Sequence, residues 1–347
     1  MTERVVNDDL RGQFLGVGSV RGTDPTIPRA YVSRIAVPYW FQLPERPTED
    51  MVRQFVYLVD GFERYSPMTL DLDIGTFREI IEDESPLLPD ADHASGLYMM
   101  IEGERQYVNF KTQQTAPATL CHTVRDRSGE KMISTDTFRF FSTLMKRVAR
   151  GQAEILRRRC RRLILCQDDP SLGFVYDELR QGRGRGLTIN QIIRETADIY
   201  PGDAIPAYHY CYDWRQLPAD GKNPLWDAGQ RIVHLDFIKY PPDISRELGE
   251  RINRFLESGG GIALGIIPNT DEQGPIDVLS TLRTNLRRVM DDFEACGVDI
   301  GLLSENAMIS TQCGLSRASD GLIYEIHNRS ELFPRVLEEE ARLRSRT

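Results

Sequence analysis

Short apolar runs alternate with longer stretches of helical hydrophobic periodicity along almost the whole chain. The runs predicted to form strands are residues 14–20, 36–43, 105–111, 162–167, 204–211, 231–237, 261–268 and 305–312. The stretches predicted to form helices are residues 26–35, a segment from about 48, 135–159, 188–200, 244–256, 275–296 and a segment within 320–345. This alternation predicts parallel strands joined by crossover helices, because each helix packs back on the sheet.

About eight such strand–helix units over 347 residues favour an α/β fold of the (β/α)8 TIM-barrel type. A doubly wound open sheet is the alternative, since the closure of a sheet cannot be read from a sequence. We expect residues 1–347 to form one barrel domain. The Pro- and Asp-rich residues 66–103 interrupt the pattern and are predicted to be an insertion or lid.

The composition is that of a soluble protein, with 40% hydrophobic and 27% charged residues and a formal net charge of −9. This acidic balance argues against a nucleic-acid partner. No apolar run reaches the ~18 residues of a membrane helix. The polar N-terminal sequence does not resemble a secretory signal, so we expect a cytoplasmic protein. Its six cysteines are therefore expected to be reduced and free for metal chemistry.

Candidate chemistry gathers where the predicted strands end, which is where such barrels carry their functional residues. His209 and Cys211 end one strand and, two positions apart, share a face. His234 and Asp236 end the next strand in the same way, and Cys313 follows the last one. We predict a metal site with His209, Cys211, Asp236 and Cys313 as its ligands. His234 is expected to support a ligand from behind, although it is also the alternative to Asp236 as the remaining ligand.

These residue types indicate the chemistry. Two thiolates and an imidazole select a soft or borderline ion, for which Zn²⁺ is the default. Zinc lowers the pKa of a coordinated thiol, so a thiol substrate would bind as the thiolate at neutral pH. A thiolate is the nucleophile needed to attack a methyl or alkyl group. A zinc hydrolase is the competing interpretation, although hydrolytic sites tend to be richer in histidine and carboxylate.

These residues resemble the catalytic domain of cobalamin-independent methionine synthase. They are still more similar to the small single-domain proteins of the methionine synthase and uroporphyrinogen decarboxylase superfamily. The resemblance covers nearly the whole chain in order, and its most specific parts are His209-x-Cys211 and Cys313-Gly314-Leu315. The other similar segments are Gly16–Ser19, Pro38–Pro44 with Glu49–Met51, Lys111–Leu120 and Gln167–Pro170.

The resemblance implies a methyltransferase of methionine biosynthesis, with Zn²⁺ at the barrel mouth and homocysteine as the thiol acceptor. It also implies that Ser19, Glu45 and Asp168 bind this amino acid, and two carboxylates suit its ammonium group. The third zinc ligand of the family is usually glutamate, and the matching residue here is Asp236.

Two departures from the family bear on the methyl donor. The folate-dependent enzymes carry a second, N-terminal barrel, which 347 residues cannot also hold, and residues 268–270 (Pro-Asn-Thr) stand in place of a catalytic histidine. We therefore expect a corrinoid or a corrinoid protein, rather than folate, as the donor. The alternatives are an epoxide transferase acting on a thiol of the coenzyme M type, a metal-independent enzyme like uroporphyrinogen decarboxylase, and a metal-storing or corrinoid-associated binding protein without turnover.

Overall fold

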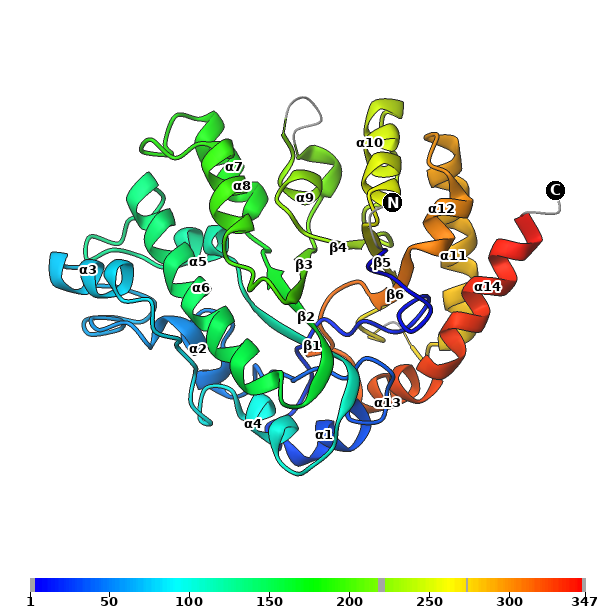
Figure 1. The fold of residues 1–347 in the computed structure, drawn as a ribbon, viewed down its shortest axis with the longest axis horizontal. Helices are drawn as coiled ribbons and strands as arrows, with labels where there is room; N and C mark the ends of the chain where they lie inside the picture. Colours follow the sequence, from blue (N-terminus) through cyan, green and yellow to red (C-terminus); the bar gives the residue numbers. More distant parts are fainter. Residues whose placement is uncertain (1–3, 218–221, 273, 345–347) are drawn as a thin grey trace.

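The computed structural model describes residues 4–217, 222–272 and 274–344 (Figure 1). Its parallel sheet is curled, and the strands follow one another in the order β1-β2-β3-β4-β5-β6. Because every strand pairs with the next one in the chain, the doubly wound alternative, whose strand order reverses, is excluded. The strands are β1 (Tyr107–Thr115), β2 (Cys160–Asp168), β3 (Ala204–Tyr210), β4 (Ile232–Asp236), β5 (Gly261–Ile267) and β6 (Ala307–Thr311).

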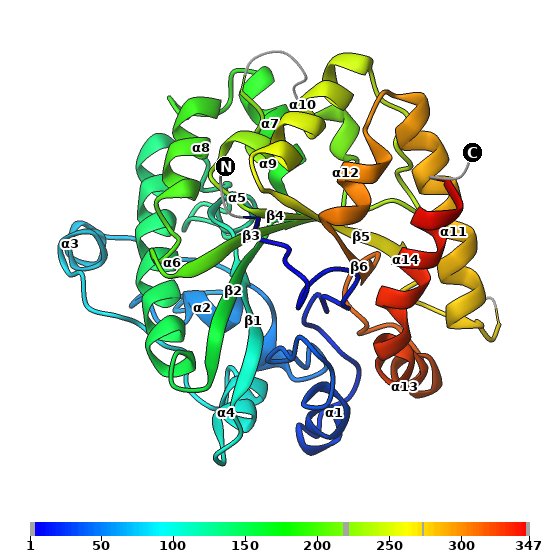
Figure 2. The same ribbon diagram turned by 45° about the vertical axis from the view of Figure 1, so that its right-hand side comes forward.

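Helices lie around the outside of the curled sheet (Figures 1 and 2). Every stretch predicted to be helical contains one, although the predicted end at residue 345 lies outside the described residues. Within the described chain, none of the helices is long and apolar enough to span a lipid bilayer. The α-helices are α1 (Thr26–Val32), α2 (Arg53–Val56), α3 (Ile74–Glu82), α4 (Ser95–Ile101), α5 (Pro117–Thr123), α6 (Thr135–Leu156), α7 (Leu172–Arg180), α8 (Ile189–Ala197), α9 (Pro224–Asp227), α10 (Arg246–Glu257), α11 (Val278–Ala295), α12 (Ile300–Glu305), α13 (Asp320–Arg329) and α14 (Phe333–Arg344). The 3-10 helices are η1 (Pro47–Glu49), η2 (Trp214–Gln216) and η3 (Ser330–Leu332).

The expectation of a closed barrel of eight strands is wrong for the first two strands, residues 14–20 and 36–43. These segments make isolated parallel bridges instead of continuous ladders, and they occupy the opening between β1 and β6 (Figure 2). Gly18 has a φ of +141° and Pro38 has no backbone N–H, and both features interrupt strand pairing. The fold is therefore a partial, barrel-like sheet. The bridges are Phe14–Ile309, Ser19–Gln42, Val20–Leu315 and Tyr39–Lys111.

The inner face of the curl changes from apolar to polar along the strands. Near the strand starts, Val5, Val6 and Leu10 of the N-terminal segment close an apolar cluster, and Val5 N donates to Gly259 O at 3.0 Å. The strand residues in this cluster are Ile164, Cys166, Ala207, Ile232, Ala263 and Met308. Further along the strands polar side chains such as Asp168, His209 and Asp236 are buried as well, so the candidate chemistry lies toward the C-terminal end of the sheet.

Helix α6 covers the outer side of β1 and β2 and shows how the sequence begins an element. Ser134 Oγ accepts from Thr137 N at 3.1 Å, and Thr137 Oγ1 accepts from Ser134 N at 3.1 Å. This capping box satisfies backbone donors that the first helical turn cannot pair. Apolar residues then recur on the face that packs on the sheet, so capping and amphipathicity both favour the helix.

Residues 66–103, expected to be an insertion or lid, contain α3 and α4. Helix α3 lies at the periphery, where it packs on α6. Helix α4 packs on the second N-terminal segment, since a Cβ at Gly96 would lie 1.9 Å from the carbonyl oxygen of Phe41. In addition, Ser95 Oγ donates to Oε1 of the buried Glu49 at 2.5 Å. The segment thus supports the irregular part of the sheet from outside.

A buried histidine joins the N-terminal segments to α13. His327 Nδ1 lies 2.7 Å from Ile323 O, and Nε2 lies 2.9 Å from the Tyr39 hydroxyl. Because a carbonyl oxygen only accepts, Nδ1 carries the proton and Nε2 accepts from the tyrosine. Burial lowers the pKa of His327 from 6.5 to about 4. The residue is therefore neutral in the folded protein at neutral pH.

We expect His327 to make the protein less stable in mild acid. The unfolded chain takes up this proton below pH 6.5, whereas the folded protein resists protonation until about pH 4. The free energy of unfolding therefore falls as the pH drops through this window, by about 3 kcal/mol at most. Urea unfolding at several pH values measures the effect. His327→Gln should show a smaller acid-induced loss than the wild type, and equal losses would contradict this account.

Candidate metal centre

Three potential metal ligands converge at the C-terminal end of the sheet. His209 lies near the end of β3, Cys211 directly follows that strand, and Cys313 lies in the loop after β6. One ligand atom of each residue lies within 4.8 Å of the other two. Nε2 of His209 is 3.7 Å from Sγ of Cys313. The structure thus brings together side chains from opposite ends of a long stretch of sequence, and it buries the imidazole while leaving both thiols partly accessible.

The two thiols share a hydrogen bond that makes them unequal. This bond raises the pKa of Cys211 well above its usual value, and burial adds to the rise. The same interaction with Cys211 lowers the pKa of Cys313, and a hydrogen bond with the backbone of Gly314 also lowers it. Cys313 is therefore the more readily ionised of the two. A thiolate is the form of cysteine that binds metals.

His209 is held between the strand and a second histidine. Its ring stacks on that of His234, with 4.3 Å between the centroids and 18° between the planes. His234 is anchored in turn, since its Nε2 lies 2.9 Å from Thr311 O. Burial lowers the pKa of both histidines, that of His234 to about 3, and neutral imidazole is the metal-binding form. Within the described residues, the buried Nδ1 of His209 makes no hydrogen bond of normal geometry.

Asp236 lies at the end of β4 but outside the three-residue group. Its Oδ1 accepts from Ile238 N at 3.0 Å and from Lys239 N at 2.9 Å, which caps the turn after the strand. Nε2 of Gln312 approaches the two carboxylate oxygens at 3.2 and 3.3 Å. Among the described residues, Oδ2 has one long hydrogen bond and Oδ1 has three partners, so Oδ2 is the less engaged oxygen of Asp236.

Ser19 and Asp168 both lie near the three potential metal ligands. Ser19 adjoins the loop of Cys313, since its Oγ would lie 1.8 Å from a Cβ added to Gly314. Asp168 ends β2 and pairs in register with His209. It is 9% exposed, and its Oδ1 has no hydrogen-bond partner in the described part of the chain. Burial raises the pKa of Asp168 to about 6. This carboxylate oxygen is therefore buried without a partner beside the potential metal ligands.

Glu45, the other acid expected to bind substrate, lies in a different setting. Its side chain is 49% exposed. Its carboxylate accepts from Gly22 N at 3.1 Å and lies 3.9 Å from Nε of Arg21. These partners belong to the surface loop that precedes α1, so the described contacts connect Glu45 to that loop rather than to the thiols.

Lys111 is a candidate that the sequence pattern did not single out. It is 1% exposed, and its Nζ donates to Val17 O and, at 3.1 Å, to Oε1 of Gln113. The charge of Lys111 opposes the effect of burial on the pKa of Asp168 and adds to the lowering of the pKa of His209. A buried cation therefore faces the polar end of the interior. The alternation of polar and apolar side chains up to Lys111 was the sequence signal that could have identified this residue.

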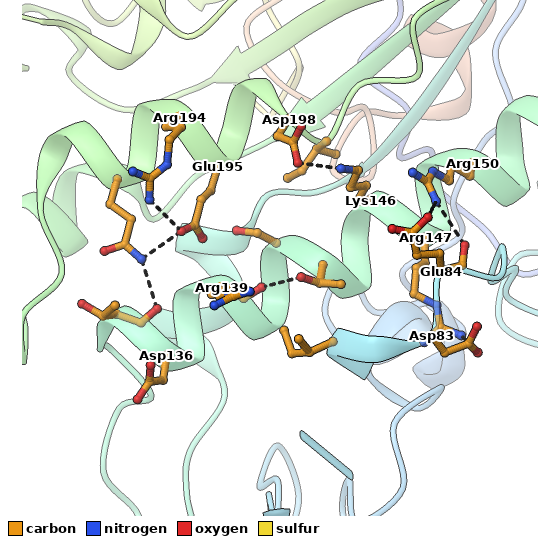
Figure 3. Close-up of a pocket in the computed structure, with 16 residues that line it drawn as sticks. Asp83, Glu84, Asp136, Arg139, Lys146, Arg147, Arg150, Arg194, Glu195 and Asp198 are labelled. Atoms are coloured by element: carbon orange, nitrogen blue, oxygen red, sulfur yellow. Dashed lines mark hydrogen bonds and ion pairs between the residues drawn. The ribbon is translucent and has the colours of Figure 1, made fainter. Parts of the chain in front are cut away.

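A groove of about 490 Å³ lies outside the sheet between α3, α6 and α8 (Figure 3). Charged side chains line it, but most of them pair with each other. Lys146 lies 2.6 Å from Asp198, and Arg194 lies 3.4 Å from Glu195. The groove contains none of the strand-end residues, and we assign it no part in the chemistry.

The donor set at the mouth fits a soft or borderline metal ion. All six cysteines are unpaired in this structure. Two sulfurs and a neutral imidazole suit Zn²⁺, whereas Mg²⁺ and Ca²⁺ take oxygen ligands. Nδ1 of His209 has no hydrogen-bond partner among the described atoms, and Nε2 faces Cys313. These residues therefore fit the predicted ion.

No protein-family model matches the chain, and no curated protein matches it by sequence. Among solved structures, the chain is similar to a B12-independent methionine synthase from Shewanella sp. W3-18-1 in complex with selenomethionine. The TM-score is 0.56 at 14% identity, over 95% of this chain and 98% of that one. A Burkholderia cenocepacia J2315 protein described as a lyase/mutase gives a TM-score of 0.22 at 13% identity, over 75% and 89% of the two chains, which is too low to indicate a shared fold. The predicted resemblance to B12-independent methionine synthase is thus confirmed in the fold.

Proposed function

We propose that this protein is a zinc-dependent methyl or alkyl transferase that acts on a small thiol, with homocysteine as the favoured acceptor. The observation that carries the proposal is the group of His209, Cys211 and Cys313 at the C-terminal end of the sheet. The fold supports it, since a B12-independent methionine synthase shares that fold over nearly the whole chain. Metal-independent decarboxylation would not require these three donor side chains.

His209, Cys211 and Cys313 would hold the zinc ion. Asp236 would be the fourth, weaker ligand through Oδ2, and His234 is the alternative. When bound, zinc lowers the pKa of a substrate thiol and so supplies a sulfur nucleophile at neutral pH. The neutral imidazole of His209 and the lowered pKa of Cys313 keep these ligands ready for the metal.

The polar groups beside the thiols would bind the amino-acid part of the acceptor. The unpartnered Oδ1 of Asp168 would accept from the ammonium group, in a charge-assisted hydrogen bond. Lys111 favours the ionised form of this carboxyl group, against the effect of burial. The Ser19 hydroxyl would donate to the carboxylate of the amino acid. Glu45 remains a predicted second partner of the ammonium group.

The donor is proposed to be a methylcorrinoid, free or on a partner protein, because residues 268–270 replace the histidine of the folate-dependent enzymes. The test is methionine formation from methylcobalamin and homocysteine by purified protein. We expect turnover that falls at least about a hundredfold after chelation and returns on adding zinc. Protein dialysed without chelator is the control.

Three outcomes would redirect the proposal. Turnover that survives complete removal of metal would exclude a zinc mechanism. Alkylation of 2-mercaptoethanesulfonate in preference to homocysteine would favour the epoxide:thiol type of enzyme. Stoichiometric zinc without binding of either thiol would favour a metal-storing protein.

A further inference from the structure

A second hollow lies on the other side of β3 from the potential metal ligands. It has a volume of about 270 Å³ and lies between α7 and the chain that follows β3. Tyr210 alternates with His209 and Cys211 along the strand, so its side chain points away from the metal ligands and into the helix layer. The aromatic side chains that line this hollow are Phe174, Tyr176, Tyr210, Tyr212 and Tyr240. We call it the tyrosine pocket.

Two of these rings are unusually accessible for large apolar groups. Phe174 is 43% exposed and Tyr212 is 41% exposed. They meet edge to face, with 5.3 Å between the ring centroids. Exposed aromatic surface beside a concave pocket is typical of a ligand site, because a bound ring would remove it from water.

One buried hydroxyl group of the pocket lining has no partner. Tyr176 is 2% exposed, and its hydroxyl makes no hydrogen bond within the described chain. Gly173 allows the Tyr210 hydroxyl its position, since an added Cβ would lie 2.5 Å from that oxygen. A buried polar group without a partner costs about 1–3 kcal/mol. A ligand that accepts a hydrogen bond from the Tyr176 hydroxyl would recover part of that cost.

The charged groups around the pocket pair with each other. Arg180 lies 3.4 Å from Asp177, and Nε of Arg215 lies 2.7 Å from Asp213. The lining therefore presents little net charge. It favours an uncharged ligand over a phosphate or a carboxylate.

We propose that the tyrosine pocket is a binding site for a planar, uncharged nitrogen heteroaromatic group, with an acceptor nitrogen that takes a hydrogen bond from a tyrosine hydroxyl. The ring would lie against Phe174 and Tyr212. This site is separate from the metal centre and does not depend on the metal. Because Tyr210 and Tyr212 flank Cys211, its occupation restrains the segment that carries one predicted metal ligand.

The experiment is calorimetric titration of purified protein with benzimidazole, which is planar and has an acceptor ring nitrogen. Indole is the matched probe, since it has the same shape and only a donor nitrogen. We expect benzimidazole to bind the wild type at least about tenfold more tightly than indole. Tyr176→Phe should abolish this preference and leave indole binding unchanged. Tyr324→Phe, which changes an exposed tyrosine of α13, is the control and should behave as the wild type.

A second variant closes the pocket without removing a hydroxyl. Gly173→Ala favours the α7 helix by about 1 kcal/mol and places a methyl group against the Tyr210 hydroxyl. We expect it to weaken the binding of both probes. Absence of benzimidazole binding to the wild type at millimolar concentration would overturn the proposal, as would equal binding by wild type, Tyr176→Phe and Gly173→Ala. Metal content, measured on the same samples, tests the proposed function separately.

Discussion

Replacing Cys313 with serine is expected to remove zinc from the protein, from about one ion per chain to a small fraction of that. The reason is that Cys313 is one of the two predicted thiolate ligands, and its Sγ lies 3.7 Å from Nε2 of His209. A serine hydroxyl does not ionise at neutral pH and is a poor zinc ligand. The loss in affinity should exceed the 10–100-fold that is typical when only a residue behind a ligand is changed. Elemental mass spectrometry of reduced, freshly purified protein measures it, and Cys211→Ser should give the same result.

The control for these variants is Cys160→Ser. Cys160 begins β2 at the opposite end of the sheet, and in the described part of the chain its thiol donates to Leu156 O at 3.4 Å, which a serine can also do. Asp236→Asn addresses the fourth ligand, because asparagine keeps the oxygen that caps the turn and loses the negative charge. We expect it to weaken zinc binding less than the cysteine variants do. Wild-type protein that takes up no zinc even when zinc is offered would end the thiol-transfer proposal.

Asp168→Asn is expected to weaken homocysteine binding by about 10- to 100-fold, the range for loss of a hydrogen bond between charged groups. Asp168 is buried and its Oδ1 is unpartnered, so its charge is not already neutralised by a direct ion pair in the described structure. Asparagine has nearly the same shape, and this limits the effect on the fold. Calorimetric titration of the zinc-loaded protein with homocysteine measures the change.

A thiol without an ammonium group separates recognition from general damage. 2-Mercaptoethanesulfonate should bind the Asp168→Asn variant at least as well as it binds the wild type. Asp169 offers a contrast, since Thr119 donates to one of its oxygens at 2.6 Å and Tyr208 to the other at 2.5 Å. Asp169→Asn should therefore lower stability without changing the preference between the two thiols. An unchanged preference in Asp168→Asn as well would remove this residue from the substrate site.

Local periodicity was sufficient where most residues of a strand are apolar. The predicted residues 204–211 and 261–268 agree with β3 (Ala204–Tyr210) and β5 (Gly261–Ile267) to within one residue. It was less successful for β1, predicted as 105–111 and observed as Tyr107–Thr115. The second half of β1 points polar side chains into the interior, so the apolar signal ends before the strand does.

The first two predicted strands show a different limit. Their hydrophobic pattern is strand-like, and both segments do lie in the sheet opening, but Gly18 and Pro38 reduce their pairing to single bridges. Pairing of that kind depends on which backbone groups face each other across the gap. A hydrophobic pattern does not contain this information.

The sequence by itself determined the parallel α/β arrangement and placed candidate ligands at strand ends, because side-chain alternation and helical periodicity are local properties of the chain. It also carried the His209-x-Cys211 spacing, which puts two donors on one face. Only the tertiary structure decided that Cys313 lies within reach of His209, 104 residues away, that Lys111 is buried beside the polar interior, and that Oδ1 of Asp236 is engaged by the backbone. These outcomes depend on the curl and register of the whole sheet and on which partners compete for each polar atom, and both are set by contacts between distant parts of the chain.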